Sequence, residues 1–215
     1  MLQFITNANN PEEIISQVEA VIAGGCKWIQ LRMKNATKED ITPVAEKLKH
    51  LCKQNDCIFV IDDWVEIAKE LELDGVHLGK NDMNPIEARI TLGSKAIIGV
   101  TANTYDDIVG YSKIDIDYIG LGPYRYTTTK KNLSPVLGIN GYSEIMQHCA
   151  ENSIRIPTVA IGGICNEDIE TIMHTGVNGV AVSGAIINAE NPKAMTEMML
   201  KKLNHIVSNR LENSK

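Results

Sequence analysis

The chain has 215 residues, 44% of them apolar, and a formal net charge of −6 at pH 7. This apolar content is enough for a sizeable core, and the acidic balance argues against nucleic acid or an anionic membrane surface as a partner. The sequence contains no run of about 18 apolar residues, so no membrane span is expected. The first residues lack the pattern of a secretory signal. The five cysteines have no metal-binding spacing, so we expect reduced thiols in a cytoplasmic protein.

Short apolar runs alternate with amphipathic stretches along the whole chain. At the first helix, Asn10 can cap the start, Pro11 suits the first position, and Gly24 ends the pattern. In chain order, we expect strands at 2–6, 27–32, 57–62, 75–78, 96–100, 118–121, 157–163 and 179–184. Helices are expected after them at 11–23, 38–55, 64–71, 84–91, 104–112, 140–152, 166–175 and 192–213.

Eight strand–helix units without a hairpin between strands require a parallel sheet covered by helices. The strands are apolar nearly throughout, as strands buried on both faces should be. The number of units predicts a closed (β/α)8 TIM barrel that forms a single domain over residues 1–215. An open, doubly wound sheet is the alternative. It usually has fewer strands, and no G-x-G-x-x-G follows the first strand here.

The residues after each strand are the candidates for function, because active sites of such barrels lie at the carboxyl ends of the strands. Gln30, Arg32 and Lys34 alternate at the end of the second strand and therefore share one face. His77 lies within an apolar strand and is better explained as a hydrogen-bonded core histidine than as a catalytic group. The other strands are followed by Asp62-Asp63, Gly79 to Asp82, Thr101 to Thr104, Gly162-Gly163 and Ser183-Gly184.

The segment GPYRYTTTKKN, residues 122–132, gathers hydroxyls and cations directly after the sixth strand. Its Lys130 joins Arg32 and Lys34 as a third cation for a highly charged anion. Asp63 and Asp82 would repel each other if bare, and Mg²⁺ resolves this because it binds carboxylates together with phosphate oxygens. The glycine turns after the seventh and eighth strands match the usual phosphate site of these barrels. The mouth is therefore predicted to hold a metal-bound diphosphate and a monophosphate.

The connection at 122–138 is much longer than the usual strand–helix connection of about 2–6 residues. Long connections of this kind tend to order when a ligand binds. We therefore expect this loop to act as a lid that is mobile without substrate.

Seven motifs resemble those of the thiamine phosphate synthase family in order and spacing, over almost the whole chain. They are QLRMK at 30–34, DD at 62–63, DGVHLGKND at 74–82, IIGVTANT at 97–104, DYIGLGPYRYTTTKK at 117–131, VAIGGI at 159–164 and GVAVSGAI at 179–186. The resemblance implies a Mg²⁺-dependent transferase that condenses 4-amino-2-methyl-5-hydroxymethylpyrimidine diphosphate with a thiazole phosphate, often the carboxylated form. The products would be thiamine phosphate and diphosphate, with CO₂ from the carboxylated substrate.

The resemblance also implies a role for each matching residue. Catalysis would involve Arg32, Lys34, Thr101 and Lys130. The pyrimidine diphosphate would be bound by Gln30, Leu31, Arg32, Met33, Lys34, Asp62, Thr101 and Lys130. The thiazole phosphate would be bound by Thr127, Thr128, Thr129, Gly163, Ser183 and Gly184, and Mg²⁺ by Asp63 and Asp82. The expected partners are these two small molecules, and assembly into a homo-oligomer is left open.

Four positions depart from the family pattern. Asp62 stands where the family usually has Asn, Lys80 where Gln is common, Thr101 where Ser is common, and Asn103 where His is common. Thr101 keeps the hydroxyl, and we expect Lys80 to offset part of the added charge of Asp62.

Three other functions compete with the synthase. A thiazole tautomerase of this fold would need a histidine at the mouth and no metal pair, whereas Asn103 stands there and both aspartates are present. A non-catalytic regulator of the thiamine pathway would be supported by loss of a metal ligand. A phosphosugar isomerase or epimerase would need a general base at a strand end.

Overall fold

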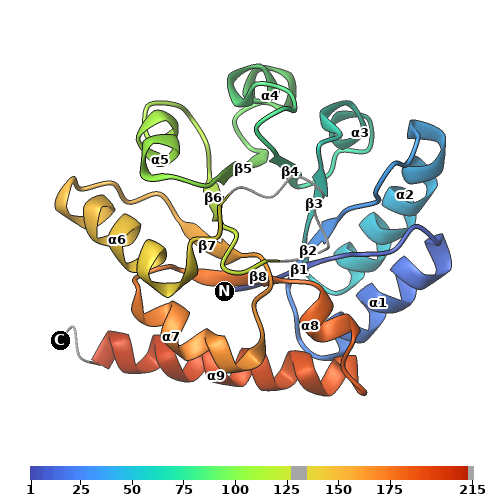
Figure 1. The fold of residues 1–215 in the computed structure, drawn as a ribbon. Coiled ribbons are helices and arrows are strands. Elements are labelled where there is room, and N and C mark those ends of the chain that lie inside the picture. Colours follow the sequence, from blue (N-terminus) through green and yellow to red (C-terminus); the bar gives the residue numbers. More distant parts are fainter. Residues whose placement is uncertain (127–134, 213–215) are drawn as a thin grey trace.

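The computed structural model describes residues 1–126 and 135–212. Its strands form a closed parallel barrel in the order β1 to β8, so each strand pairs with its neighbours in sequence and β8 returns to β1 (Figure 1). The predicted (β/α)8 fold class is therefore confirmed. The strands are β1 (Leu2–Ile5), β2 (Trp28–Leu31), β3 (Ile58–Asp62), β4 (Gly75–Leu78), β5 (Ile97–Ala102), β6 (Tyr118–Leu121), β7 (Thr158–Ile161) and β8 (Gly179–Val182).

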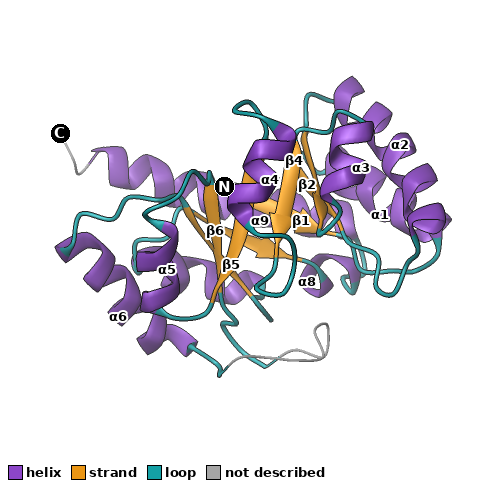
Figure 2. Ribbon diagram, turned by 90° about the horizontal axis from the view of Figure 1, so that it is seen from above, coloured by secondary structure: helices purple, strands orange, loops and turns teal. Residues whose placement is uncertain are grey.

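Helices surround the strands on the outside of the barrel (Figure 2). Some of them begin at side-chain caps: the Asn10 side chain accepts from the N–H groups of Glu12 and Glu13, and Thr37 forms a capping box with Asp40. The helices are α1 (Pro11–Ala23), α2 (Lys38–Gln54), α3 (Val65–Glu70), α4 (Pro85–Leu92), α5 (Tyr105–Tyr111), α6 (Gly138–Glu151), α7 (Ile169–His174), α8 (Gly184–Ile187) and α9 (Pro192–Glu212).

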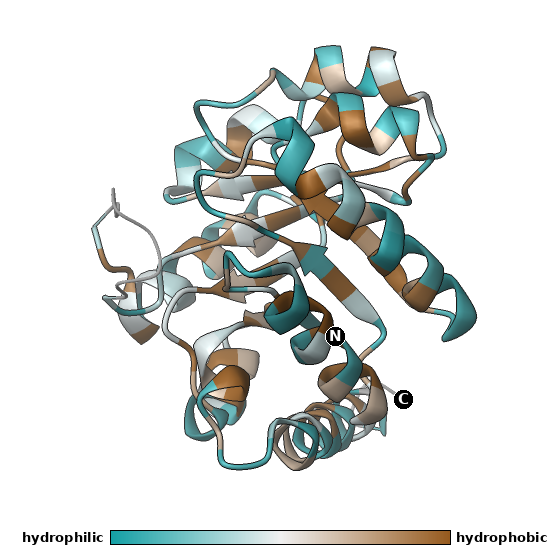
Figure 3. Cartoon of the chain, turned by 90° about the vertical axis from the view of Figure 1, so that its right-hand side faces the viewer, coloured by the Kyte–Doolittle hydropathy of each residue, from teal (hydrophilic) through white to brown (hydrophobic). Residues whose placement is uncertain are grey.

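Two apolar layers stabilise the barrel, and the strand period of two assigns residues to them. On β2, Trp28 belongs to the cluster that fills the barrel interior with Tyr118 and Val159. Ile29 and Leu31 of the same strand are fully buried in the larger cluster between the strands and the helices. The helices are correspondingly striped, with apolar and polar residues alternating along each helix (Figure 3).

All eight strands and most helices lie within a few residues of the prediction. The predicted helix at 166–175 begins with a 3-10 turn, Asn166–Asp168, and only the four-residue helix α8 was not predicted. A four-residue helix is too short to show a hydrophobic period, and it opens with Gly184, so the sequence reads as a turn. No helix in the described ranges is long and apolar enough to cross a membrane.

The barrel is closed by both ends of the chain. β1 pairs with β8 through the register Leu2 to Val180, Gln3 to Ala181 and Phe4 to Val182. The long helix α9 packs against α1, α7 and β1, and it lies along the side of the barrel where β1 and β8 meet (Figure 1). The seam between the first and last strands is therefore covered by a helix from beyond the last strand.

Candidate active site

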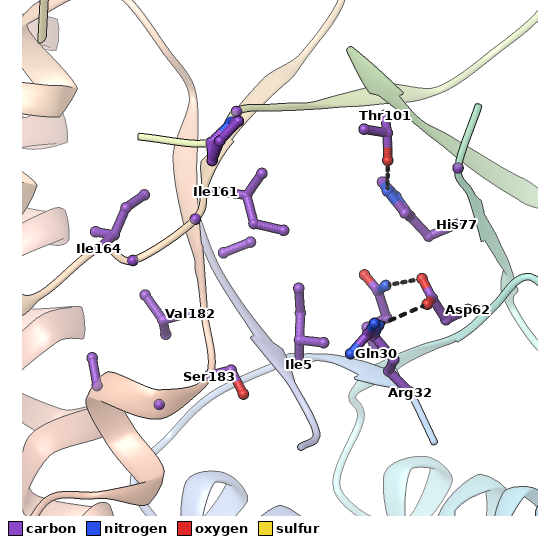
Figure 4. A pocket seen from close by; sticks show the side chains of 18 of the residues that line it. Ile5, Gln30, Arg32, Asp62, His77, Thr101, Ile161, Ile164, Val182 and Ser183 are labelled. Atoms are coloured by element: carbon purple, nitrogen blue, oxygen red, sulfur yellow. Dashed lines mark hydrogen bonds and ion pairs between the residues drawn. The ribbon is translucent and has the colours of Figure 1, made fainter. Parts of the chain in front are cut away.

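A cavity of about 1030 Å³ opens at the carboxyl ends of the strands, as expected for this barrel. One wall is polar and carries Gln30, Arg32, Asp62, His77 and Thr101, whereas an apolar wall lies opposite (Figure 4). The apolar wall includes Ile161, Ile164 and Val182. The volume lies at the upper end of the range of about 300–1,000 Å³ that is typical of small-molecule sites. The cavity has room for two small ligands.

Asp62 organises the polar wall from the end of β3. Its Oδ1 accepts a hydrogen bond of 2.6 Å from Gln30 Nε2, and its Oδ2 lies 3.2 Å from Arg32 Nε (Figure 4). The terminal nitrogens of Arg32 have no partner among the residues that the structure describes, so they are available to an anion in the cavity. The pair is partly screened from water, since 22% of the Arg32 and 15% of the Asp62 side chain is exposed.

Asp63 and Asp82 form a carboxylate pair on the same rim. Burial raises the pKa of Asp63 to about 8, and the charges of Asp62 and Asp82 and a hydrogen bond with Asp82 add to this effect. Asp82 is oriented by the Gly79 N–H, which donates to Oδ2 at 2.7 Å. Asp63 has a φ of 68°, a backbone conformation that non-glycine residues rarely adopt and that is concentrated at functional sites.

These two carboxylates fit a Mg²⁺ ion. Two close, partly buried carboxylates favour a shared cation because one of them otherwise retains a proton. Within residues 1–126 and 135–212, no group of three or more His, Cys, Asp or Glu side chains is arranged to hold a metal. A bound Mg²⁺ would therefore rely on Asp63, Asp82, water and phosphate oxygens, which is its ordinary mode of binding in phosphate-processing sites.

Lys80 contacts Asp107, and its expected offset of the charge of Asp62 stays a prediction. Its Nζ lies 2.6 Å from Asp107 Oδ2 on α5, whereas Arg32 is in direct contact with Asp62. Asn103 also has a structural contact: its Nδ2 donates to the Gly122 carbonyl at 2.6 Å. Asn103 thus holds the end of β6 in place.

The turn after β7 lies beside the turn after β8 at the cavity, because β7 and β8 are neighbouring strands. Gly162 and Gly163 have φ of 101° and 69°, and an added Cβ would lie 2.7 Å from Pro123 and 2.4 Å from Arg125 Cγ, respectively. Glycine is therefore required there by both conformation and space. Ser183 lines the same cavity, and its buried Oγ has no hydrogen-bond partner within the described part of the chain. A buried hydroxyl without a partner is suited to a ligand oxygen.

The first residues of the long loop after β6 are hydrogen-bonded to β7 and to the last residues of the same loop. Backbone bonds link Tyr124 N to the Ile161 carbonyl at 2.9 Å and Arg125 N to the Gly162 carbonyl at 3.0 Å. Leu137 N donates to the Pro123 carbonyl at 2.9 Å, which joins the two ends of the loop. The predicted ligands Thr127, Thr128, Thr129 and Lys130 lie outside the described residues, and the lid stays a prediction.

Three predicted pyrimidine-site residues do not line the main cavity. Met33 and Lys34 line a smaller adjoining hollow of about 240 Å³ together with Arg32 and Asp63. Leu31 is fully buried in the outer core, because the alternation along β2 directs its side chain away from the barrel interior. The remaining predicted residues in the described ranges, namely Gln30, Arg32, Asp62, Asp63, Asp82, Thr101, Gly163, Ser183 and Gly184, line the main cavity.

His77 is buried and hydrogen-bonded on both ring nitrogens, as expected of a core histidine. Nδ1 lies 3.0 Å from the Tyr118 hydroxyl and Nε2 lies 3.0 Å from Thr101 Oγ1. Sequence reasoning missed Gln3 and Tyr118, which join this group through the Gln3 Nε2 atom, 3.1 Å from the Tyr118 hydroxyl. Gln3 is a polar residue within an apolar strand, and that was the available signal.

A parallel eight-stranded barrel whose mouth combines paired carboxylates, the Arg32 guanidinium and glycine turns defines a (β/α)8 enzyme suited to phosphorylated small molecules. A family profile described as thiamine monophosphate synthase matches residues 2–186. The thiamine-phosphate synthases of Bacteroides thetaiotaomicron and Bacteroides fragilis are 53% and 54% identical to the chain over 199 residues. These matches cover 93% of this chain and 95% and 98% of the two relatives.

The chain belongs to the thiamine monophosphate synthase family. A solved thiamine phosphate pyrophosphorylase from Pyrococcus furiosus superposes with a TM-score of 0.83 at 31% identity, over 95% of this chain and 96% of that one. The resemblance read from the sequence is thereby confirmed, as is the enzyme class, a thiamine-phosphate synthase and thus a transferase. The tautomerase and regulator alternatives are not favoured.

Proposed function

We propose that this cavity binds both substrates of the synthase at once, with the pyrimidine diphosphate on the polar wall and the thiazole phosphate near the glycine turns. The observation that carries the proposal is the set of Arg32, Asp62, Asp63 and Asp82 on one rim of the cavity. Cations beside paired carboxylates suit a diphosphate with its metal ion. Ser183 and the turn at Gly163, across the cavity, suit a monophosphate.

Asp63 and Asp82 would hold the Mg²⁺, which supplies neutralisation of the charge on the departing diphosphate. The free edge of Arg32 would bind diphosphate oxygens, with Asp62 fixing the orientation of the guanidinium through Nε. Lys34 in the adjoining hollow and Lys130, outside the described residues, would add positive charge where the leaving group develops negative charge. All these groups stabilise the diphosphate as it leaves the carbon of the pyrimidine substrate.

The attack by the thiazole nitrogen needs no base, because that nitrogen carries a lone pair and no proton. The apolar wall at Ile161, Ile164 and Val182 would pack against a heterocycle and exclude water from the reactive carbon. Thr127, Thr128 and Thr129 would complete the phosphate site from the loop. A cytoplasmic location is part of this proposal and fits the five cysteines, all of which are free thiols.

The test is thiamine phosphate formation, followed by thiochrome fluorescence after mixing both substrates, across a range of Mg²⁺ concentrations. Asp63→Ala and Asp82→Ala should each lower turnover by about 100-fold or more, by the scale of lost transition-state stabilisation. Circular dichroism checks that each variant is folded. Asp106→Ala on the exposed side of α5 is the matched control and should keep full activity. Turnover at the normal rate without Mg²⁺, or in either site variant, would show that the metal assignment is wrong.

A further inference from the structure

A continuous chain of hydrogen bonds crosses the barrel interior beneath the cavity. It runs from Asp62 to Gln30 at 2.6 Å, from Gln30 Oε1 to Gln3 Nε2 at 3.0 Å, and from Gln3 Nε2 to the Tyr118 hydroxyl at 3.1 Å. From Tyr118 it continues through His77, whose Nε2 lies 3.0 Å from the Thr101 hydroxyl. The two ends of the chain, Asp62 and Thr101, both face the ligand cavity (Figure 4).

The carboxylate at one end sets the direction of the first bonds. Both Asp62 oxygens accept, one from Gln30 and the other from Arg32. Gln30 must therefore turn its amide nitrogen to Asp62 and its oxygen to Gln3. That oxygen accepts, so Gln3 presents its amide nitrogen, whose second hydrogen is directed to Tyr118. An amide flip at either glutamine would place two acceptors or two donors against each other.

The hydroxyl of Tyr118 passes the direction on to His77. Tyr118 is 2% exposed, and the hydrogen-bond partners of its hydroxyl within the described ranges are Gln3 Nε2 and His77 Nδ1. Because it accepts from Gln3, its single hydrogen must go to Nδ1, or a buried O–H would lack an acceptor. His77 then carries its proton on Nε2 and donates to Thr101 Oγ1. The hydrogen of Thr101 is left to point elsewhere.

We propose that this chain holds His77 as the neutral Nε2–H tautomer and thereby makes the Thr101 hydroxyl a dedicated hydrogen-bond donor to the bound ligand. Gln3, Tyr118 and His77 are positioning residues, since they act on the ligand only through Thr101. The ligand atom opposite Thr101 must then be a hydrogen-bond acceptor, such as a ring nitrogen of the pyrimidine type. This last step rests on the proposed binding of the pyrimidine diphosphate at the polar wall.

Two glycines leave the space that the chain of bonds occupies. A Cβ added to Gly99 would lie 2.1 Å from Tyr118 Cζ, and one added to Gly120 would lie 3.0 Å from His77 Cε1. Both glycines lie within strands, where glycine costs stability because it has no side chain to pack. Their positions indicate that the room for the two rings is built into β5 and β6.

The direct test is nitrogen NMR of the wild-type protein with labelled imidazoles at pH 8, without substrates or metal. The His77 signals, assigned through the backbone, should show a proton on Nε2 and none on Nδ1. A protonated Nδ1, in the neutral or the charged ring, overturns the proposal. This readout does not depend on activity, so it separates failure of this inference from failure of the proposed function.

The second test is kinetic and uses Tyr118→Phe, which removes only the hydroxyl in the middle of the chain. The variant should raise the KM of the pyrimidine diphosphate roughly threefold to tenfold, the range for one lost neutral hydrogen bond. The KM of the thiazole phosphate should not change. Equal rises for both substrates, or none, would contradict the proposal.

Two further variants serve as controls for the kinetic test. Tyr105→Phe is the control, because the Tyr105 ring packs against His148 on the outer helices, away from this chain of bonds. Thr101→Val removes the proposed donor itself, and in the double variant with Tyr118→Phe the two effects should not add, because both act through one hydroxyl. Full additivity would mean that Tyr118 acts independently of Thr101. If Tyr118→Phe does not fold, the NMR result on the wild type decides.

Discussion

Tyr142 joins the ends of β6 and β7 from helix α6, and removing its hydroxyl should weaken the barrel at its mouth. The side chain is fully buried, and its hydroxyl donates to the Leu121 carbonyl and accepts from Ile161 N at 3.2 Å. Burial raises the pKa of this hydroxyl, so it stays protonated and remains a donor. Tyr142→Phe keeps the ring and removes both bonds.

The expected loss follows from two buried backbone groups that lose a partner. Each such group costs about 1–3 kcal/mol when left unsatisfied, so the free energy of unfolding should fall by about 2–6 kcal/mol. In a domain of this size the midpoint of thermal unfolding should drop by roughly 4 °C or more. Urea unfolding followed by circular dichroism measures the first quantity, and a thermal scan measures the second.

Tyr105→Phe is the matched control, since the Tyr105 hydroxyl has no hydrogen bond among the described residues, and it should change stability by less than about 0.5 kcal/mol. A similar small change in Tyr142→Phe would refute the reasoning. It would mean that the Leu121 carbonyl and the Ile161 N–H pair with each other or with water once the hydroxyl is gone.

Two further predictions concern a turn and a thiol. Gly163→Ala should destabilise the protein by about 1–3 kcal/mol, because φ is positive there and the new Cβ would displace Arg125. The variant should also raise the KM for thiazole phosphate. Urea unfolding and steady-state kinetics measure the two effects, and values equal to those of the wild type would contradict the prediction. Burial raises the pKa of Cys26 from 9.0 to about 11, so the folded state retains this proton longer than the unfolded state. The resulting stability is fully present below pH 9 and is lost as the pH rises through about 11. Urea unfolding at pH 8 to 11 should therefore show a flatter decline in Cys26→Ala than in wild type, and identical slopes would count against this origin.

The strands and most helices could be predicted because their signals are local. The cap at Asn10 and the two-residue period along β2 each act within a few residues. The position of the cavity also followed, since parallel strands bring their carboxyl ends to one rim. The ion-pair partner of Lys80 could not be predicted. Whether Lys80 contacts Asp62 or Asp107 depends on the positions of β3 and α5 in the folded barrel.

The hydrogen bonds inside the barrel could not be predicted from the sequence either. Gln3 and Tyr118 are far apart along the chain, and only barrel closure brings their side chains to 3.1 Å. His77 was correctly expected to be a hydrogen-bonded core residue, but its two partners come from different strands. Contacts of this kind are set by strand order and register, which act after the local elements have formed.

Closure of the barrel between β1 and β8 has a consequence for synthesis on the ribosome. Leu2 is translated 178 residues before its partner Val180. At about 5–20 residues per second, the first strand waits roughly 10–35 s with one edge unpaired. During that interval its unsatisfied backbone groups can pair with another nascent chain. We expect the yield of folded protein to depend on chaperones that shield this edge. Helix α9, which follows β8 in the chain, should complete the closure by packing over the seam.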